Sequence, residues 1–302
     1  MQFRKMKMSE AKIKLRYVYF PFIIVSVVST ILFCILYEVF SVYGNGEFIK
    51  EDLWFFWFPA VFGCLVVFLF LRKNLRIIQD NRGDGNSGLA MMMVSMIAFA
   101  CGIAVTYYSF AVFGLKEVAS PTQIMEFPNE RFFKIRNFRV RREDRVLFRV
   151  NHTSGKRRKY MTFLNYYATP FTEGQRGIWY GYLYSERIDN GPSDKIKSER
   201  EYFDAYARKF MGNFNYENPT YFSRVLHSET KERFFSAIKT VYPYLNYRDI
   251  IILEPHENSF AERDKSNTEI LWWIFIAGNL IILGILILSK VDHQEFKKFK
   301  KP

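Results

Sequence analysis

The sequence predicts an integral membrane protein of the α-helical class, with four transmembrane helices and one exported α+β domain between helices 3 and 4. Three observations predict this class. Four long segments are almost free of charged side chains, and basic residues gather in the two tails and one loop. About half of the 302 residues lie between the third and fourth apolar segments, where the periodicity is that of a folded domain.

The four apolar segments are long enough to cross a bilayer. A helix rises 1.5 Å per residue, so about 20 residues cover the roughly 30 Å hydrocarbon core. The first segment follows a basic stretch, as in a secretion signal, but it is too long for one and no small-x-small cleavage pattern follows it. We therefore expect a retained helix. The expected segments are a tail over 1–16, helices over 17–40, 54–71 and 89–113, an exported domain over 114–269, a helix over 270–289 and a tail over 290–302.

The distribution of Lys and Arg predicts the orientation. The tails 1–16 and 290–302 and the loop 72–88 hold 15 of the 43 basic residues, whereas the short loop 41–53 holds Lys50 alone. Cytoplasmic segments retain basic residues, and long domains are translocated largely regardless of their charge. The sequence therefore predicts a multi-pass protein of the bacterial inner (plasma) membrane with both termini cytoplasmic. The lipid bilayer is the first expected partner.

Alternating and helical periods predict the elements of the exported domain. A turn containing Gly155 between two β-rich runs indicates a hairpin. Ser198 followed three residues later by Glu201 has the form of a capping box. We expect strands over 132–141, 145–152, 157–171, 178–188, 220–227 and 248–255, with helices over 199–212 and 230–242.

The Cys and His residues give no pattern of a cofactor or metal site. Cys34, Cys64 and Cys101 all lie in apolar segments, where a thiol packs as a small apolar side chain. No CxxC or Cys/His spacing occurs, and the histidines of the exported segment are far apart in the sequence. We expect no cofactor and no metal.

One short motif raises the possibility of catalysis. Residues 85–88 read G-x-S-G, the form in which rhomboid proteases present their nucleophile, which makes Ser87 the candidate catalytic residue. A serine nucleophile needs a base within hydrogen-bond reach, and His293 is the only histidine near the cytoplasmic face. A flexible loop is the alternative interpretation, which we favour.

Basic residues at the start of the exported domain suggest binding to a membrane surface or a partner. Anionic headgroups attract such residues by about 1 kcal/mol each. A solvated hairpin face is the equally weighted alternative, and nucleic acid is not expected outside a membrane. The candidates are Arg141, Arg142, Lys156, Arg157, Arg158 and Lys159.

Aromatic residues are frequent in the exported segment, as in the stretches NYYATPF and IWYGYLY. Such rings line peptide or sugar grooves, but they are also common in strands that pack on helices. We expect core packing.

The chain resembles the region that precedes the protease domain in rhomboid-family membrane proteins of Bacteroidetes bacteria. The stretches that carry the resemblance are WFFWFPAVF, FFKIRNFRV, WYGYLYSERIDN, IILEPHENSFAER and LWWIF. In those relatives later membrane helices supply the catalytic serine and histidine. The resemblance therefore implies an accessory region and assigns no catalytic residue here.

These observations predict a non-enzymatic inner-membrane protein whose exported domain binds or positions a partner, another membrane or periplasmic protein. Two alternatives stay open. One is a subunit or remnant of an intramembrane serine protease, and the other is an immunity-like protective membrane protein.

Overall fold

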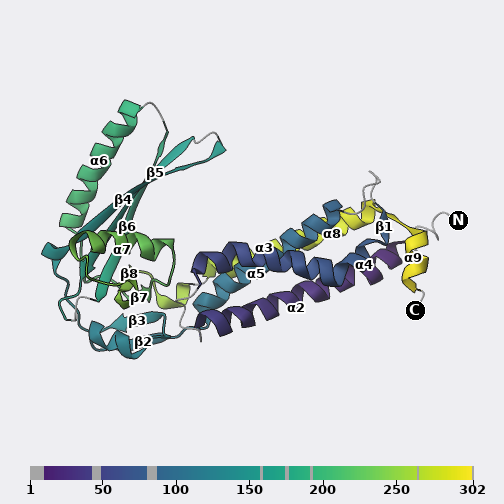
Figure 1. The fold of residues 1–302 in the computed structure, drawn as a ribbon, viewed down its shortest axis with the longest axis horizontal. Coiled ribbons are helices and arrows are strands. Elements are labelled where there is room, and N and C mark those ends of the chain that lie inside the picture. The colour runs from purple at the N-terminus through teal and green to yellow at the C-terminus, as the bar shows by residue number, and fades with distance from the viewer. Residues whose placement is uncertain are drawn as a thin grey trace. The chain divides into compact units, whose positions relative to one another are not determined.

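The computed structural model describes residues 10–42, 49–79, 87–156, 159–173, 177–190, 193–263 and 265–300. The chain divides into two compact units (Figure 1). The helical unit comprises Met1–Gly44, Glu51–Val112 and Asp264–Pro302, and the sheet unit comprises Asn45–Lys50 and Phe113–Arg263. Each unit has its own hydrophobic interior and is described separately.

The helical unit is built from apolar helices, some of which contain π-helical turns. The π-helical turns are η1 (Leu15–Tyr19), η2 (Glu38–Val42), η3 (Leu53–Trp57) and η4 (Val67–Leu71), and the α-helices are α2 (Phe20–Tyr37), α3 (Phe58–Val66), α4 (Arg72–Leu75), α5 (Ser87–Ala111), α8 (Lys265–Leu288) and α9 (His293–Lys300). Turns η1 and η3 each end two residues before a proline, Pro21 or Pro59. A proline ring removes one backbone donor and clashes with the carbonyl of the preceding turn, and a wider π turn accommodates this.

Three helical stretches among the described residues are long and apolar enough to cross a membrane. They are Glu10–Ser41, Leu53–Leu75 and Ser87–Ala111. A further apolar stretch of the described residues, Trp272–Leu288 of α8, is shorter than these three. About 20 apolar residues are needed to span the hydrocarbon core. Three stretches of the described residues meet this length, instead of the four expected.

The predicted fold class was therefore wrong. The chain is a mixed α/β fold with a seven-stranded mixed sheet and three helices of membrane-spanning length among the described residues, instead of a four-helix membrane protein with an inserted α+β domain. The sheet is the larger correction, since the strand patterns predicted six strands and gave no strand order, whereas the sheet has seven strands and two parallel pairs.

Close contacts join the helices of the helical unit. A Cβ atom built on Gly102 of α5 would lie 2.7 Å from the carbonyl oxygen of Phe55, so only a glycine permits this approach. The Tyr108 hydroxyl donates a hydrogen bond of 2.8 Å to the Glu38 carboxylate. This bond satisfies a carboxylate that is otherwise costly among apolar helices.

One end of the helical unit gathers three basic segments. The Lys14 ammonium donates to the carbonyls of Ile287 (3.2 Å) and Ser289 (2.6 Å). Strands β1 (Ile78–Gln79) and β9 (Lys290–Val291) pair antiparallel at this end. The residues after α4 and those after α8 are therefore neighbours of the N-terminal region.

The sheet unit contains strands β2 to β8 in the spatial order β2-β3-β7-β8-β6-β5-β4. Two neighbouring pairs are parallel, β2 with β3 and β6 with β8, and the other pairs are antiparallel. The elements are β2 (Leu115–Val118), η5 (Pro121–Glu126), β3 (Phe132–Ile135), η6 (Arg142–Asp144), β4 (Val146–Ser154), β5 (Tyr160–Pro170), β6 (Ile178–Asp189), α6 (Ser193–Gly212), β7 (Tyr221–Arg224), α7 (Glu229–Val241), η8 (Tyr247–Asp249), β8 (Ile251–His256) and η9 (Phe260–Glu262).

Helices α6 and α7 cover opposite faces of this sheet (Figure 1). Phe203 of α6 packs on Phe163 of β5, with ring centroids 5.5 Å apart, and Phe234 of α7 packs on Tyr166 of the same strand at 5.2 Å. Residues three apart on a strand point to opposite faces. Both faces are therefore filled with aromatic side chains, which confirms core packing for most of the aromatic stretches.

Several predicted elements are confirmed, and some predicted boundaries were wrong. The hairpin of β4 and β5 is present, and Gly155 in its turn has φ 85°. Strand β6 and helix α7 lie within two residues of their predicted ends. The strand expected over 132–141 ends at Ile135. Helix α6 begins at Ser193, so Ser198 lies inside it and donates to the Lys195 carbonyl instead of capping the helix.

Gly102→Ala tests the helix contact. The added methyl meets backbone atoms, which cannot move aside as a flexible side chain does, so we expect destabilisation of about 1–3 kcal/mol. Thermal unfolding of the detergent-solubilised chain would show a lower midpoint. Gly284→Ala is the matched control, because a Cβ built on Gly284 meets nothing within 4 Å. Equal midpoints for the two variants would contradict the contact.

Candidate functional site

A pocket of about 460 Å³ lies where β7 ends and β8 begins. We call it the basic pocket, because cationic side chains contribute much of its lining and no Asp or Glu is among the described residues that form it. Its volume is within the range of small-ligand sites. The lining residues are Met125, Pro128, Arg224, Val225, Leu226, His227, Lys231, Tyr247, Arg248, Ile250 and Ile251.

Three local structures bring the cations together. Arg224 is the last residue of β7, and the Ser228 hydroxyl caps α7 by accepting a hydrogen bond of 3.3 Å from the backbone N–H of Lys231. This cap places Lys231 in the first turn of α7. Arg248 lies in the turn η8, three residues before β8 starts.

The Arg224 guanidinium supplies a positive charge fixed by the fold. It donates hydrogen bonds to the carbonyls of Pro128 and Ile124, the latter at 3.0 Å, and lies over the Phe133 ring. Burial lowers the pKa of Arg224 to about 10, and the charge of Glu130 opposes this shift. Arg224 is therefore still charged at neutral pH.

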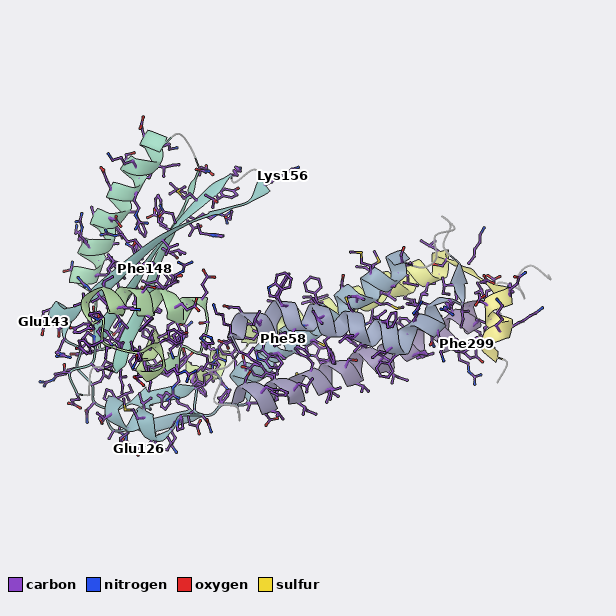
Figure 2. The ribbon with its side chains drawn as sticks, viewed as in Figure 1. Phe58, Glu126, Glu143, Phe148, Lys156 and Phe299 are labelled. Atoms are coloured by element: carbon purple, nitrogen blue, oxygen red, sulfur yellow. The ribbon has the colours of Figure 1, made fainter. Side chains whose placement is uncertain are left out.

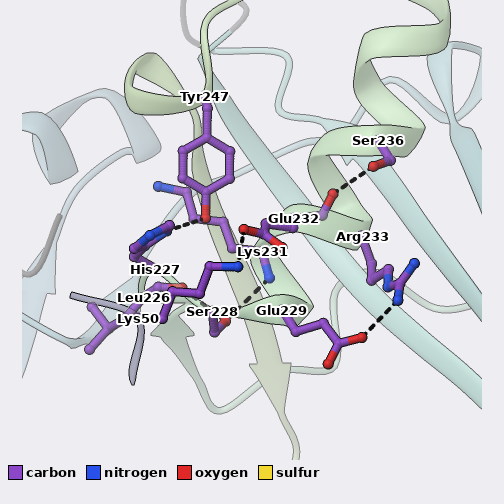
Figure 3. A network of polar contacts seen from close by, with 10 residues as sticks. All are labelled: Lys50, Leu226, His227, Ser228, Glu229, Lys231, Glu232, Arg233, Ser236 and Tyr247. Carbon is purple, nitrogen blue, oxygen red and sulfur yellow. Dashed lines mark hydrogen bonds and ion pairs between the residues drawn. The ribbon is translucent and has the colours of Figure 1, made fainter. Parts of the chain in front are cut away.

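His227, Lys231 and Tyr247 form the polar wall of the pocket (Figure 3). The His227 ring nitrogen Nδ1 lies 2.7 Å from the Tyr247 hydroxyl, and the Lys231 ammonium lies 4.8 Å from the centre of the Tyr247 ring. Both contacts orient the tyrosine. The Tyr247 hydroxyl, the His227 ring and the Lys231 ammonium thus lie close together, although they come from two loops and a helix.

Two carboxylates of α7 beside this wall have cationic partners of their own (Figure 3). Glu229 accepts from Arg233 at 2.7 Å, and Glu232 pairs with Lys50 at 2.6 Å. The hydrogen bond from Arg233 and then its charge hold the pKa of Glu229 below its ordinary value. Both carboxylates are paired with cations that do not line the pocket, so the pocket keeps the chemistry of an anion-binding site.

Ser87, the candidate nucleophile, is exposed at the first position of α5. In the described part of the chain it has no histidine partner, and His293 instead lies 3.4 Å from Glu10. Gly85 and Asn86 lie outside the described residues. No hydrogen bond among the described residues joins Ser87 to a side chain that could act as its base.

The basic candidates at the start of the sheet unit are divided between the two ends of β4 (Figure 2). Arg141 pairs with Asp144 at 3.4 Å, and Arg142 lies over the Tyr216 ring. Lys156 follows the hairpin turn, and Lys159 lies over the Tyr160 ring. Nine strand residues, about 30 Å, separate these two groups. Arg157 and Arg158 lie outside the described residues.

A second serine and histidine pair occurs in the sheet. The Ser223 hydroxyl of β7 lies 2.7 Å from Nε2 of His256 in β8. Ser223 is only 8 % exposed, and the Tyr221 ring stacks on the His256 ring at 4.6 Å. These neighbours cover the hydroxyl, so the pair is a polar contact of the sheet interior and not an open nucleophile.

Comparison with protein-family models, curated proteins and solved structures finds no match to this chain. Among the described residues there is also no group of three Asp, Glu, His or Cys side chains arranged to hold a metal ion. The function is therefore inferred from the geometry of the sites.

The buried His256 predicts a pH dependence of stability. Burial, and then the charge of Arg131, lowers the pKa of His256 below its ordinary 6.5. The folded chain thus binds a proton at His256 less readily than the unfolded chain does. The free energy of unfolding therefore loses none of its value through this group above pH 6.5, and it decreases as the pH falls below 6.5. We expect a lower thermal midpoint at pH 5.5 than at pH 7.5.

His256→Gln is the control for this prediction and should reduce the difference between the two pH values. Glu254 acts in the opposite direction, because burial raises its pKa despite the charge of Arg131. Its contribution is the same in both chains and cancels in the comparison. An unchanged pH dependence in His256→Gln would rule out His256 as the cause.

Proposed function

We propose that the chain is a non-enzymatic, multi-pass protein of a bacterial inner membrane whose sheet unit is exported and binds or positions another membrane or periplasmic protein. The partner presents an acidic group, and the basic pocket receives it. The resemblance to the accessory region of rhomboid-family proteins suggests the same type of role.

The basic pocket is the observation on which this proposal rests. Arg224, Lys231 and Arg248 line it together with His227, and the neighbouring Glu229 and Glu232 are already paired. A carboxylate entering the pocket would exchange water for charge-assisted hydrogen bonds from several donors. Apolar lining residues such as Met125 and Ile250 would pack against the carbon atoms that carry the carboxylate.

The membrane location is supported by the three helices of spanning length and by the position of the basic segments. Lys14, the strand β1 and the strand β9 lie at one end of the helical unit. Cytoplasmic ends of membrane helices carry an excess of Lys and Arg. This supports a cytoplasmic location for both termini.

Site-specific crosslinking tests the partner site. A photoreactive amino acid in place of Met125, an exposed apolar lining residue, should give a protein adduct in native membranes. This replacement leaves the three cations of the pocket in place. Lys231→Glu in the same chain should reduce the adduct at least tenfold, because it puts a negative charge where the acidic group binds. The adduct is measured by immunoblot and identified by mass spectrometry.

Two controls accompany this experiment. The same photoreactive residue at Arg139, an exposed arginine outside the pocket, should give no such adduct. Lys195→Glu, a charge reversal on the exposed side of α6, should leave the Met125 adduct unchanged. An adduct that persists in Lys231→Glu would reject the basic pocket as the partner site.

Fusions to alkaline phosphatase, which is active only outside the cytoplasm, test the orientation. A fusion inserted between β6 and α6 should be active, and fusions at either terminus should be inactive. Activity of a terminal fusion would contradict the proposed location of that terminus.

A further inference from the structure

A second cavity, of about 480 Å³, lies at the other end of β7 and β8. Its lining comes from the last turn of α6, the chain that follows it, and Glu257 after β8. We call it the aromatic groove, because Tyr206, Phe210 and Phe214 contribute rings to it. It is separate from the basic pocket, with which it shares no lining residue.

The rings of the aromatic groove are held by the rings beneath them. Phe214 packs on Tyr182 with centroids 4.6 Å apart, and Phe210 is stacked on Tyr182 with an angle of 26° between the planes. Tyr206 is 51 % exposed and lies beside Tyr184. The groove thus presents a preformed aromatic surface, and little side-chain freedom is lost when a ligand binds to it.

The polar part of the groove consists mainly of amides. Asn213, Asn215 and Asn218 line it. The Asn215 amide nitrogen donates to the Asn218 side-chain oxygen at 3.3 Å, and the Asn215 side-chain oxygen accepts from the backbone N–H of Glu217 at 3.0 Å. These bonds orient two of the amides. An amide both donates and accepts hydrogen bonds, as a ligand rich in hydroxyl groups requires.

The charges of the groove favour a neutral ligand. One cation, Lys209, and one carboxylate, Glu257, are among its described lining residues, so it lacks the excess of positive charge found in the basic pocket. The Glu257 carboxylate is an acceptor for hydroxyl groups. The groove therefore combines flat aromatic faces, oriented amides and nearly balanced charge.

We propose that the aromatic groove binds a saccharide chain. A pyranose ring with equatorial hydroxyl groups has two faces of C–H bonds and an edge of hydroxyl groups. Aromatic faces carry negative charge density that attracts the polarised C–H bonds, so Tyr206 and Phe210 would contact a sugar face. The amides and Glu257 would bind the hydroxyl edge. This function is additional to partner binding at the basic pocket.

Titration calorimetry with cellotetraose and chitotetraose tests the proposal. Both have flat pyranose faces, and chitotetraose adds acetamido groups. The full chain is reconstituted in lipid nanodiscs, so that no glycoside detergent competes for the groove. We expect saturable binding of at least one tetrasaccharide, weakened about tenfold by Tyr206→Ala through loss of the ring that contacts the sugar.

Tyr202→Ala is the matched control. Tyr202 lies four residues earlier on α6, is 66 % exposed and does not line the groove, so its removal should leave the affinity unchanged. Failure of both tetrasaccharides to bind at millimolar concentration, or equal losses in the two tyrosine variants, would overturn the proposal. Loss of binding in Lys231→Glu but not in Tyr206→Ala would also overturn it, since the ligand would then occupy the basic pocket.

Discussion

The pairing of β8 with both β6 and β7 is the constraint on which the sheet unit depends. Without this six-residue strand, the strands β2, β3 and β7 and the strands β6, β5 and β4 would form two separate sheets with open edges. Neighbouring residues of β8 serve the two cores, because Ile252 faces α7 and Leu253 packs on the opposite face, each fully buried. The strand β8 therefore joins the two halves of the sheet and also contributes a buried side chain to the core on each face.

The same strand positions both candidate sites. The basic pocket lies where β8 begins and the aromatic groove lies where it ends, each formed by loops that enter or leave the β7–β8 pair. Loops on a rigid scaffold are where binding residues usually occur. The two ends differ in chemistry, with converging cations at one and oriented amides beside rings at the other, so the sites suit different ligands.

Local patterns predicted much of the fold, and non-local pairing was missed. The β4–β5 hairpin and α7 carry their signals within a few residues, at Gly155 and in the spacing of Phe234, Ala237 and Ile238. The parallel pairing of β6 with β8 joins residues about 70 positions apart, for which a strand pattern contains no signal.

The binding site was harder to predict than the fold, because charged residues that are neighbours in the sequence need not be neighbours in space. Lys156, the first residue of the conspicuous basic run, follows Gly155 of the hairpin turn, and β4 separates it from Arg141 and Arg142. The basic pocket instead collects Arg224, Lys231 and Arg248, each unremarkable in its own stretch of sequence, through the end of a strand, a helix cap and a short turn. The strands, helices and turns between charged residues thus decide whether those residues lie close enough to bind one ligand. The sequence predicted only some of these elements.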